Sequence, residues 1–160
     1  MDRGGATLLS ETSLSDRLVV DASVAVSWLL TDEASRTTEA LLLEVLQPGP
    51  DGEPLGFWVP SIWPLEMVNS LAVAHRRGRL TEAQFWRRVT EVGRMSALVD
   101  QPEMAGYVER LAPLCVTHRL AAYDTAYLEL AIRRRATLAT LDGALRAAAE
   151  AAGVTVRPLG

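Results

Sequence analysis

Short apolar segments alternate with longer segments of helical periodicity along most of this chain. The strand-like segments are RLVV at 17–20, FWVP at 57–60, SALVD at 96–100, ATLAT at 136–140 and a final VTV at 154–156. Each is separated from the next by at least one segment with apolar residues at helical spacing. Strands that alternate with helices favour a parallel sheet with helices on both faces. The sequence therefore predicts an α/β fold of three layers, with a central, mostly parallel sheet flanked by helices.

The expected helices have recognisable ends. The helical segments are about 23–30, 32–46, 61–77, 81–95, 102–119, 121–135 and 142–152. Thr31 or Asp32 would cap the second of them. Thr81 and Gln84 form a capping-box pattern at the start of the fourth. In the fifth, Pro113 lacks a backbone donor and is expected to kink or split the helix.

Length and composition suit one packed domain. The chain has 160 residues, of which 49% are apolar, enough to bury a full core. We expect residues 1–16 to be a flexible N-terminal tail and residues 17–160 to form the domain. No apolar run is long enough to cross a membrane, and the N-terminus lacks the apolar centre of a secretory signal. Cys115 is the single cysteine, which fits a buried thiol in a reducing cytoplasm.

The charged residues exclude some chemistry. The net charge is −4, so long-range attraction does not favour nucleic acid. Every basic side chain except the two histidines is arginine. The absence of lysine excludes Schiff-base catalysis and Walker A phosphate loops.

Four carboxylates stand where an apolar strand ends or a helix begins. Asp21 and Asp142 follow strands, whereas Glu66 and Asp124 fall in first helical turns. A helix that follows a parallel strand starts at the same edge of the sheet, and ligands in such folds bind beyond the carboxyl ends of the strands. We therefore expect all four side chains to face one rim.

Each of these acids also has an ordinary explanation, because Asp caps helices and acids complement the helix dipole. Four together are harder to explain in this way. Two carboxylates about 4 Å apart repel by roughly 4 kcal/mol at an effective dielectric near 20. Four need protonation or a cation, and oxygen ligands suit Mg²⁺ or Mn²⁺.

Other polar residues give weaker signals. Ser23 and Thr140 lie two residues from an acid and could orient a carboxylate or a metal-bound water, although both suit helix or strand ends. His75 and His118 are expected at the surface. Most arginines at helix ends are expected to complement the dipole, and one or two could contact substrate phosphates. The four tryptophans fit a core or an interface better than base stacking.

Taken together, four segments resemble PIN-domain ribonucleases, specifically the VapC-type toxins of bacterial toxin–antitoxin pairs. The segments are VVDASVAVSWLL, VPSIWPLEMVNSLAVAHRRGRLT, LAAYDTAYLELA and LATLDGALRAAAEAAGV. The resemblance covers about residues 18–157 and implies a PIN-like fold. It identifies Asp21, Glu66, Asp124 and Asp142 with the metal-binding acids of that family, and Ser23 with a polar residue often found after the first acid.

The resemblance also implies an activity and partners. It implies Mg²⁺- or Mn²⁺-dependent endonuclease action on RNA, a homodimer, and a cognate antitoxin that blocks the active site. Asp21, Asp124 and Asp142 would hold the metal, and Glu66 would be a ligand or a base that aligns the attacking water.

Two alternatives stay open on the residues alone. The acidic rim could dock a basic partner in a catalytically silent regulatory subunit. A phosphatase or phosphoacceptor domain of the haloacid-dehalogenase or response-regulator type also places acids at strand ends, but it typically uses a lysine that this chain lacks.

Overall fold

The computed structural model describes residues 18–30 and 32–159. They contain four short strands, namely β1 (Leu18–Val20), β2 (Phe57–Pro60), β3 (Ala97–Asp100) and β4 (Thr137–Ala139). The strands form one parallel sheet in the order β3-β2-β1-β4. All strand–helix–strand connections therefore bring the carboxyl ends of the strands to one edge, as the alternation in the sequence predicts.

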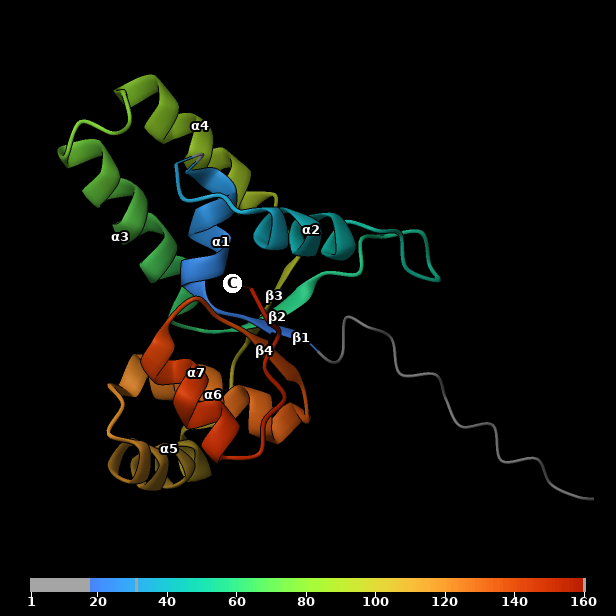
Figure 1. The fold of residues 1–160 in the computed structure, drawn as a ribbon, viewed down its shortest axis with the longest axis vertical. Helices are drawn as coiled ribbons and strands as arrows, with labels where there is room; N and C mark the ends of the chain where they lie inside the picture. Colours follow the sequence, from blue (N-terminus) through green and yellow to red (C-terminus); the bar gives the residue numbers. More distant parts are fainter. Residues whose placement is uncertain (1–17, 31, 160) are drawn as a thin grey trace, which may run out of the picture.

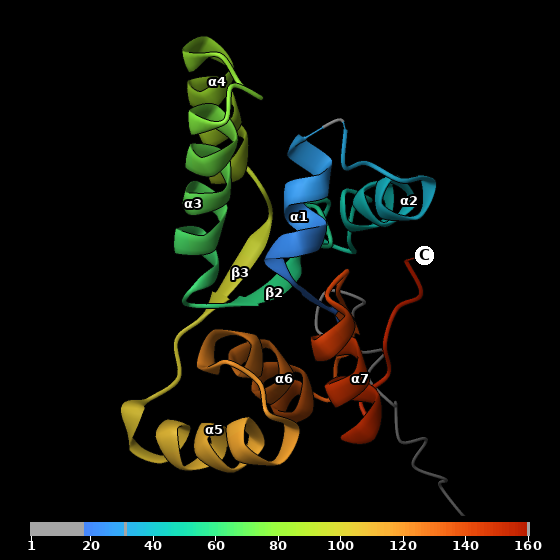
Figure 2. The same cartoon turned by 60° about the vertical axis from the view of Figure 1, so that its left-hand side comes forward.

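Seven helices flank this sheet in the described residues. They are α1 (Ala22–Leu29), α2 (Arg36–Val45), α3 (Trp63–Arg76), α4 (Glu82–Gly93), α5 (Met104–His118), α6 (Ala122–Arg134) and α7 (Gly143–Ala151). The first four helices lie on one side of the sheet and the last three on the other (Figures 1 and 2). The expected α/β fold of three layers is confirmed.

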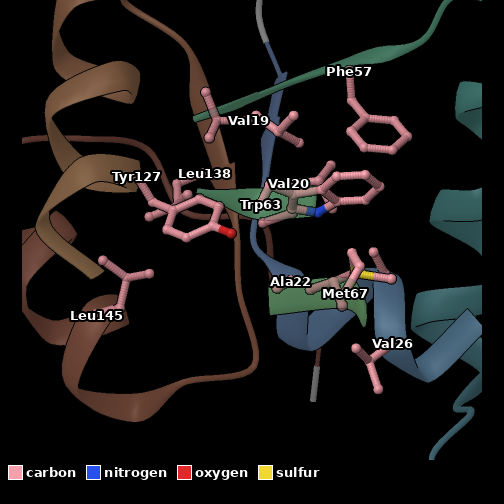
Figure 3. Packing of buried hydrophobic residues seen from close by; sticks show 14 of the residues in the cluster. Val19, Val20, Ala22, Val26, Phe57, Trp63, Met67, Tyr127, Leu138 and Leu145 are labelled. Atoms are coloured by element: carbon pink, nitrogen blue, oxygen red, sulfur yellow. The ribbon is translucent and has the colours of Figure 1, made fainter. Parts of the chain in front are cut away.

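The core lies on both faces of the short strands. Val19 and Val20 of β1 are fully buried in the middle of the sheet. Met67 of α3 packs on one face and Tyr127 of α6 on the other, as Figure 3 shows. Strands buried on both faces have continuous apolar sequences rather than alternating ones, which explains why β1 reads LVV, with no polar residue between Leu18 and Asp21.

The predicted start of α2 is wrong. Asp32, one of the two predicted caps, does not cap this helix, and Thr31, the other, lies outside the described residues. Ser35 is the cap: its hydroxyl accepts from the Thr38 amide, and the Thr38 hydroxyl accepts from the Ser35 amide. This reciprocal pair satisfies two backbone N–H donors at the start of α2.

The predicted break at Pro113 is also misplaced. The non-helical backbone angles of α5 are at Ala105 and Gly106, and Gly106 has φ +79°. Glycine takes positive φ without a steric penalty, so the chain turns there. Pro113 stays within the helical stretch, on an exposed face.

One further expectation about the elements is confirmed, and another is only partly correct. Thr81 and Gln84 form the predicted capping box of α4. The segment 154–156 contributes a single parallel bridge, Leu138↔Val156, rather than a strand. The tail expected at 1–16 lies outside the described residues. No helix of the described residues has the length and apolar character needed to cross a membrane.

Candidate functional site

The four predicted carboxylates line one pocket at the carboxyl edge of the sheet. The pocket has a volume of about 460 Å³, and Asp21, Glu66, Asp124 and Asp142 all contribute to its wall. Asp21 and Asp142 directly precede α1 and α7, while Glu66 and Asp124 lie in the first turns of α3 and α6. The structure thus brings together side chains that are far apart in the sequence.

Asp21 is the most buried of the four, with 6% of its surface exposed. Its Oδ2 accepts hydrogen bonds from Ser23 Oγ at 2.6 Å and from Thr140 Oγ1 at 2.7 Å. Burial raises the pKa of the Asp21 carboxyl, although both hydroxyls oppose the rise, and the charge of Asp142 raises it further. As the residue before α1, Asp21 makes no side-chain capping bond, so the capping explanation does not account for it.

The two hydroxyls also join the ends of β1 and β4. Ser23 Oγ accepts from the Leu141 amide at 3.1 Å, and Thr140 Oγ1 accepts from the Asp142 amide at 3.0 Å. Ser23 and Thr140 therefore orient the Asp21 carboxylate and hold the segment that carries Asp142.

Glu66 is held from the opposite side of the sheet. The fully buried Tyr127 of α6 donates its hydroxyl proton to Glu66 Oε2 at 2.5 Å. Burial raises the pKa of the Glu66 carboxyl, Tyr127 lowers it, and the charges of Asp21 and Asp124 raise it again. Burial and the bond to Glu66 raise the pKa of the Tyr127 hydroxyl far above its ordinary value, so the phenol is a donor.

Asp124 and Asp142 complete the cluster. Burial raises the pKa of the Asp124 carboxyl, and the charges of Asp142 and Asp21 add to the rise. Asp142 Oδ1 accepts from the Leu145 amide at 2.7 Å and caps α7. The ordinary capping explanation is therefore correct for one oxygen of Asp142, which can serve both purposes.

The donor set fits a hydrated divalent ion. Within residues 18–30 and 32–159, no three His, Cys, Asp or Glu side chains already enclose a single ion-sized point. Mg²⁺ does not require such an enclosure, because it usually keeps several waters and binds through one or two carboxylates. Burial and the negative charge of neighbouring carboxylates raise the pKa values of Asp21, Glu66 and Asp124. The pocket is therefore short of positive charge, which a hard cation would supply.

Sequence reasoning missed several pocket residues. Asn69 and Ser70 line the wall three and four residues after Glu66, and their helical spacing could have identified them. Tyr127, within the apolar stretch AYLELA, has no sequence feature that separates it from an ordinary core residue of its helix. Glu33 and Arg79 also line the pocket, but no sequence pattern indicates that the two segments that carry them meet.

The other candidates lie outside the pocket. His75 accompanies the α3–α4 turn, where its Nδ1 is 2.9 Å from the Leu80 carbonyl oxygen. Cys115 is half-buried rather than buried, and its thiol donates to Thr125. Arg133 and Arg134 pair with Asp100, which agrees with the structural role expected for helix-end arginines.

Comparison with known proteins agrees with this architecture. The family model described as PIN domain matches residues 18–151. Among solved structures, the crystal structure of PAE2754 from Pyrobaculum aerophilum is similar, with a TM-score of 0.62 and 19% sequence identity over 93% of this chain and 89% of that chain. At that identity the likeness concerns the fold. A comparison with curated proteins finds no match.

Proposed function

The chain belongs to the PIN-domain family, whose members are generally nucleases that use divalent metal ions, and from this premise we propose that it is a Mg²⁺- or Mn²⁺-dependent endoribonuclease. The observation that carries the proposal is the gathering of Asp21, Glu66, Asp124 and Asp142 in one pocket. Neither capping nor dipole effects require three buried or half-buried carboxylates whose pKa values are raised by burial and by the charges of neighbouring acids.

The residues have distinct proposed roles. Asp21, Asp124 and Asp142 would hold the metal, and Glu66 would be a further ligand or would align the attacking water. A bound divalent ion would supply Lewis-acid activation of the phosphate and of water. Ser23 and Thr140 keep the Asp21 carboxylate in one orientation, and Tyr127 does the same for Glu66. The reaction would hydrolyse an RNA phosphodiester bond and leave a 5′-phosphate and a 3′-hydroxyl.

We also propose that the protein is a cytoplasmic homodimer and the toxin of a toxin–antitoxin pair. Leu65, 66% exposed, directly precedes Glu66, and Tyr123, 58% exposed, directly precedes Asp124. Large exposed apolar side chains beside a pocket support a protein partner there. A cognate antitoxin that covers them would also block access to the carboxylates.

The first prediction concerns the metal and Asp21. Asp21→Asn is expected to reduce RNA cleavage by more than about 100-fold, because losing a ligand removes several kcal/mol of transition-state stabilisation and each 1.36 kcal/mol is tenfold in rate. EDTA is expected to abolish cleavage by the wild type, and Mn²⁺ or Mg²⁺ to restore it. Gel analysis of a labelled RNA oligonucleotide measures both.

The matched control is Asp51→Asn, which changes an exposed acid in the loop before β2 and is expected to cleave like the wild type. Cleavage that persists both in EDTA and in Asp21→Asn would contradict the proposed mechanism.

A catalytically silent docking subunit is the second candidate. The observation that favours it is that no three side chains of the described residues already enclose an ion. Calorimetry separates the two functions: binding of Mn²⁺ to the purified protein, lost in Asp21→Asn, supports the nuclease, and no binding of Mn²⁺ supports docking.

A further inference from the structure

The carboxylate pocket continues as a groove between α1 and α3. Both helices leave the carboxyl edge of the sheet and run to the end where α3 turns into α4 (Figure 2). One wall carries Ser23 and Val26 of α1, followed by Leu30 and Glu33. The opposite wall carries Glu66, Asn69, Ser70 and Val73 of α3, followed by Arg79.

Arg79 is the one cationic side chain among the described residues that line this groove. Glu66 and Val73 are seven residues apart on α3, which corresponds to roughly 10 Å along the helix axis at 1.5 Å per residue. Arg79 lies beyond Val73, in the turn that follows α3. It is therefore too far along the groove to contact the phosphate at the cleaved bond, whereas it can reach a neighbouring phosphate of the same strand.

The backbone of Arg79 is fixed by the way α3 ends. The Gly78 amide donates to the His75 carbonyl and the Arg79 amide donates to the Ala74 carbonyl, both at 2.9 Å. Gly78 has φ +73°. This is the Schellman arrangement, in which a left-handed glycine closes the helix and two of its last carbonyls are satisfied. The base of the Arg79 side chain is thereby held at the end of the groove.

The Arg79 guanidinium is occupied by carboxylates from the opposite wall. Its Nη2 lies 2.8 Å from Asp32 Oδ2 and 2.6 Å from Glu33 Oε1, and its Nε also donates to Asp32 at 3.2 Å. The side chains of Arg79, Asp32 and Glu33 are 34%, 65% and 40% exposed. Ion pairs this exposed contribute little to stability, so an incoming anion can replace them.

The Arg79 guanidinium can bind phosphate oxygens in the same geometry as it binds these carboxylates. The planar guanidinium presents donors in a fixed fork that matches carboxylate and phosphate oxygens alike. The other arginines at helix ends near the sheet, Arg133 and Arg134, are engaged by Asp100 and do not line the groove.

We propose that Arg79 binds a phosphate of a nucleotide flanking the cleaved bond, and that it exchanges Asp32 and Glu33 for phosphate oxygens when the strand enters the groove. This inference rests on the proposed nuclease function and assigns Arg79 to binding of the strand rather than to the chemical step. The sequence alone does not single out Arg79 among the arginines of the α3–α4 turn.

The test compares Arg79→Ala with Arg77→Ala, which removes the same charge from the same turn but outside the groove. With a single-stranded RNA oligonucleotide, Arg79→Ala is expected to raise KM about 10-fold, the effect of losing one charge-assisted hydrogen bond, and to change kcat much less. With bis(p-nitrophenyl) phosphate, which has no flanking phosphate, the change is expected to be much smaller. Arg77→Ala is expected to behave like the wild type with both substrates.

Binding measured without turnover distinguishes this inference from the proposed function. Fluorescence anisotropy with a labelled oligonucleotide in EDTA gives Kd as a function of salt. Arg79→Ala is expected to lower the slope of log Kd against log salt by about 0.7, the value for one contact to a single strand. An unchanged Kd and slope would overturn the role of Arg79 even if cleavage is found. If the wild type cleaves neither substrate, the proposed function fails, and the anisotropy result still decides the role of Arg79.

A second experiment tests the exchange of partners. Asp32→Asn with Glu33→Gln frees Arg79 and is expected to lower the Kd for the oligonucleotide several-fold. The same pair of changes in the Arg79→Ala background is expected to have a much smaller effect, because residues in contact are energetically coupled. Equal effects in both backgrounds would mean that the two carboxylates only repel the strand, and would overturn the exchange.

Discussion

Three hydroxyl groups determine how the pocket presents its carboxylates. Ser23 and Thr140 both donate to Oδ2 of Asp21, and Tyr127 donates to Oε2 of Glu66. Groups that orient a ligand from behind typically change metal affinity or activity by 10–100-fold when removed. We therefore expect the site to depend on these hydroxyls as well as on the acids that they orient.

The Glu66–Tyr127 bond can be tested with Tyr127→Phe, which keeps the ring and removes the hydroxyl. We expect kcat for RNA cleavage to fall about 10–100-fold and the free energy of unfolding to fall by no more than about 1.5 kcal/mol. Because the Tyr127 hydroxyl lowers the pKa of Glu66, its loss is expected to raise that pKa and move the acidic limb of the pH–rate profile to higher pH.

The control for that change is Tyr107→Phe, which removes a half-buried phenol from α5, outside the pocket. An unchanged rate and pH profile in Tyr127→Phe would show that Glu66 does not depend on this bond.

The four acids could be predicted from the sequence, whereas Tyr127 could not. An acid beside an apolar strand is conspicuous because it is rarely buried without a partner. A tyrosine within an apolar helix looks like any other core residue, and its hydroxyl acquires a function only when α6 lies across the sheet from α3. Ser23 and Thr140 were identified by their nearness to acids in the sequence, but the shared bond to Asp21 depends on the pairing of β1 with β4.

The helices illustrate which local signals are decisive. The α4 capping box is reciprocal, since the Thr81 hydroxyl accepts from the Gln84 amide and the Gln84 side chain accepts from the Thr81 amide. Such a pattern was readable in advance. For α2 the sequence offers more than one candidate cap. The structure uses the reciprocal pair of Ser35 and Thr38, and Asp32 pairs with Arg79 instead. Long-range pairing of this kind is invisible in a single segment.

The value of the α4 cap can be measured with Thr81→Ala. We expect this change to lower the free energy of unfolding by about 1 kcal/mol, the typical loss for a cap residue replaced by alanine. Denaturant titration followed by circular dichroism measures the change.

Thr90→Ala provides the matched control, because the Thr90 hydroxyl only bonds back to the Trp86 carbonyl within the same helix. Alanine has the higher helix propensity, so this control is expected to be neutral or slightly stabilising. Equal destabilisation by both changes would mean that the cap itself contributes nothing.

The site depends on the whole parallel sheet, because its acids come from segments that only the complete sheet brings together. Its order, β3-β2-β1-β4, puts β1 and β4 side by side, and their carboxyl ends carry Asp21 and Asp142. The alternation of elements predicted the parallel strands and their common edge, but not this order. The gathering of charge at one edge also means that the site opposes the stability of the fold at neutral pH.

This opposition predicts a pH dependence in EDTA. The pKa values of Asp21, Glu66 and Asp124 are raised above the ordinary values of 3.8 and 4.5, so the folded state binds more protons than the unfolded state just above that range. Stability is then expected to fall as pH rises through the raised values. Asp100 and Glu91, whose pKa values are lowered, lose their stabilising effect only at lower pH.

Asp124→Asn is accordingly expected to be more stable than the wild type at pH 7, with a difference that shrinks as the pH approaches the ordinary Asp value. Thermal unfolding between about pH 5 and 8 measures this, with Asp51→Asn as the control for removing an exposed acid. A difference that is independent of pH would contradict the cluster as its cause.

The bond between Thr140 and Asp21 spans 119 residues, and this has a consequence for synthesis. A nascent chain that has been released from β1 to the end of α3 already carries Asp21 and Glu66. It has neither β4, which pairs with β1, nor the Thr140 hydroxyl and Asp142. The pocket is incomplete until the fourth strand has left the ribosome and docked. Asp124 and Asp142 are synthesised last among the four carboxylates. The protein therefore cannot assemble its site until translation is nearly finished.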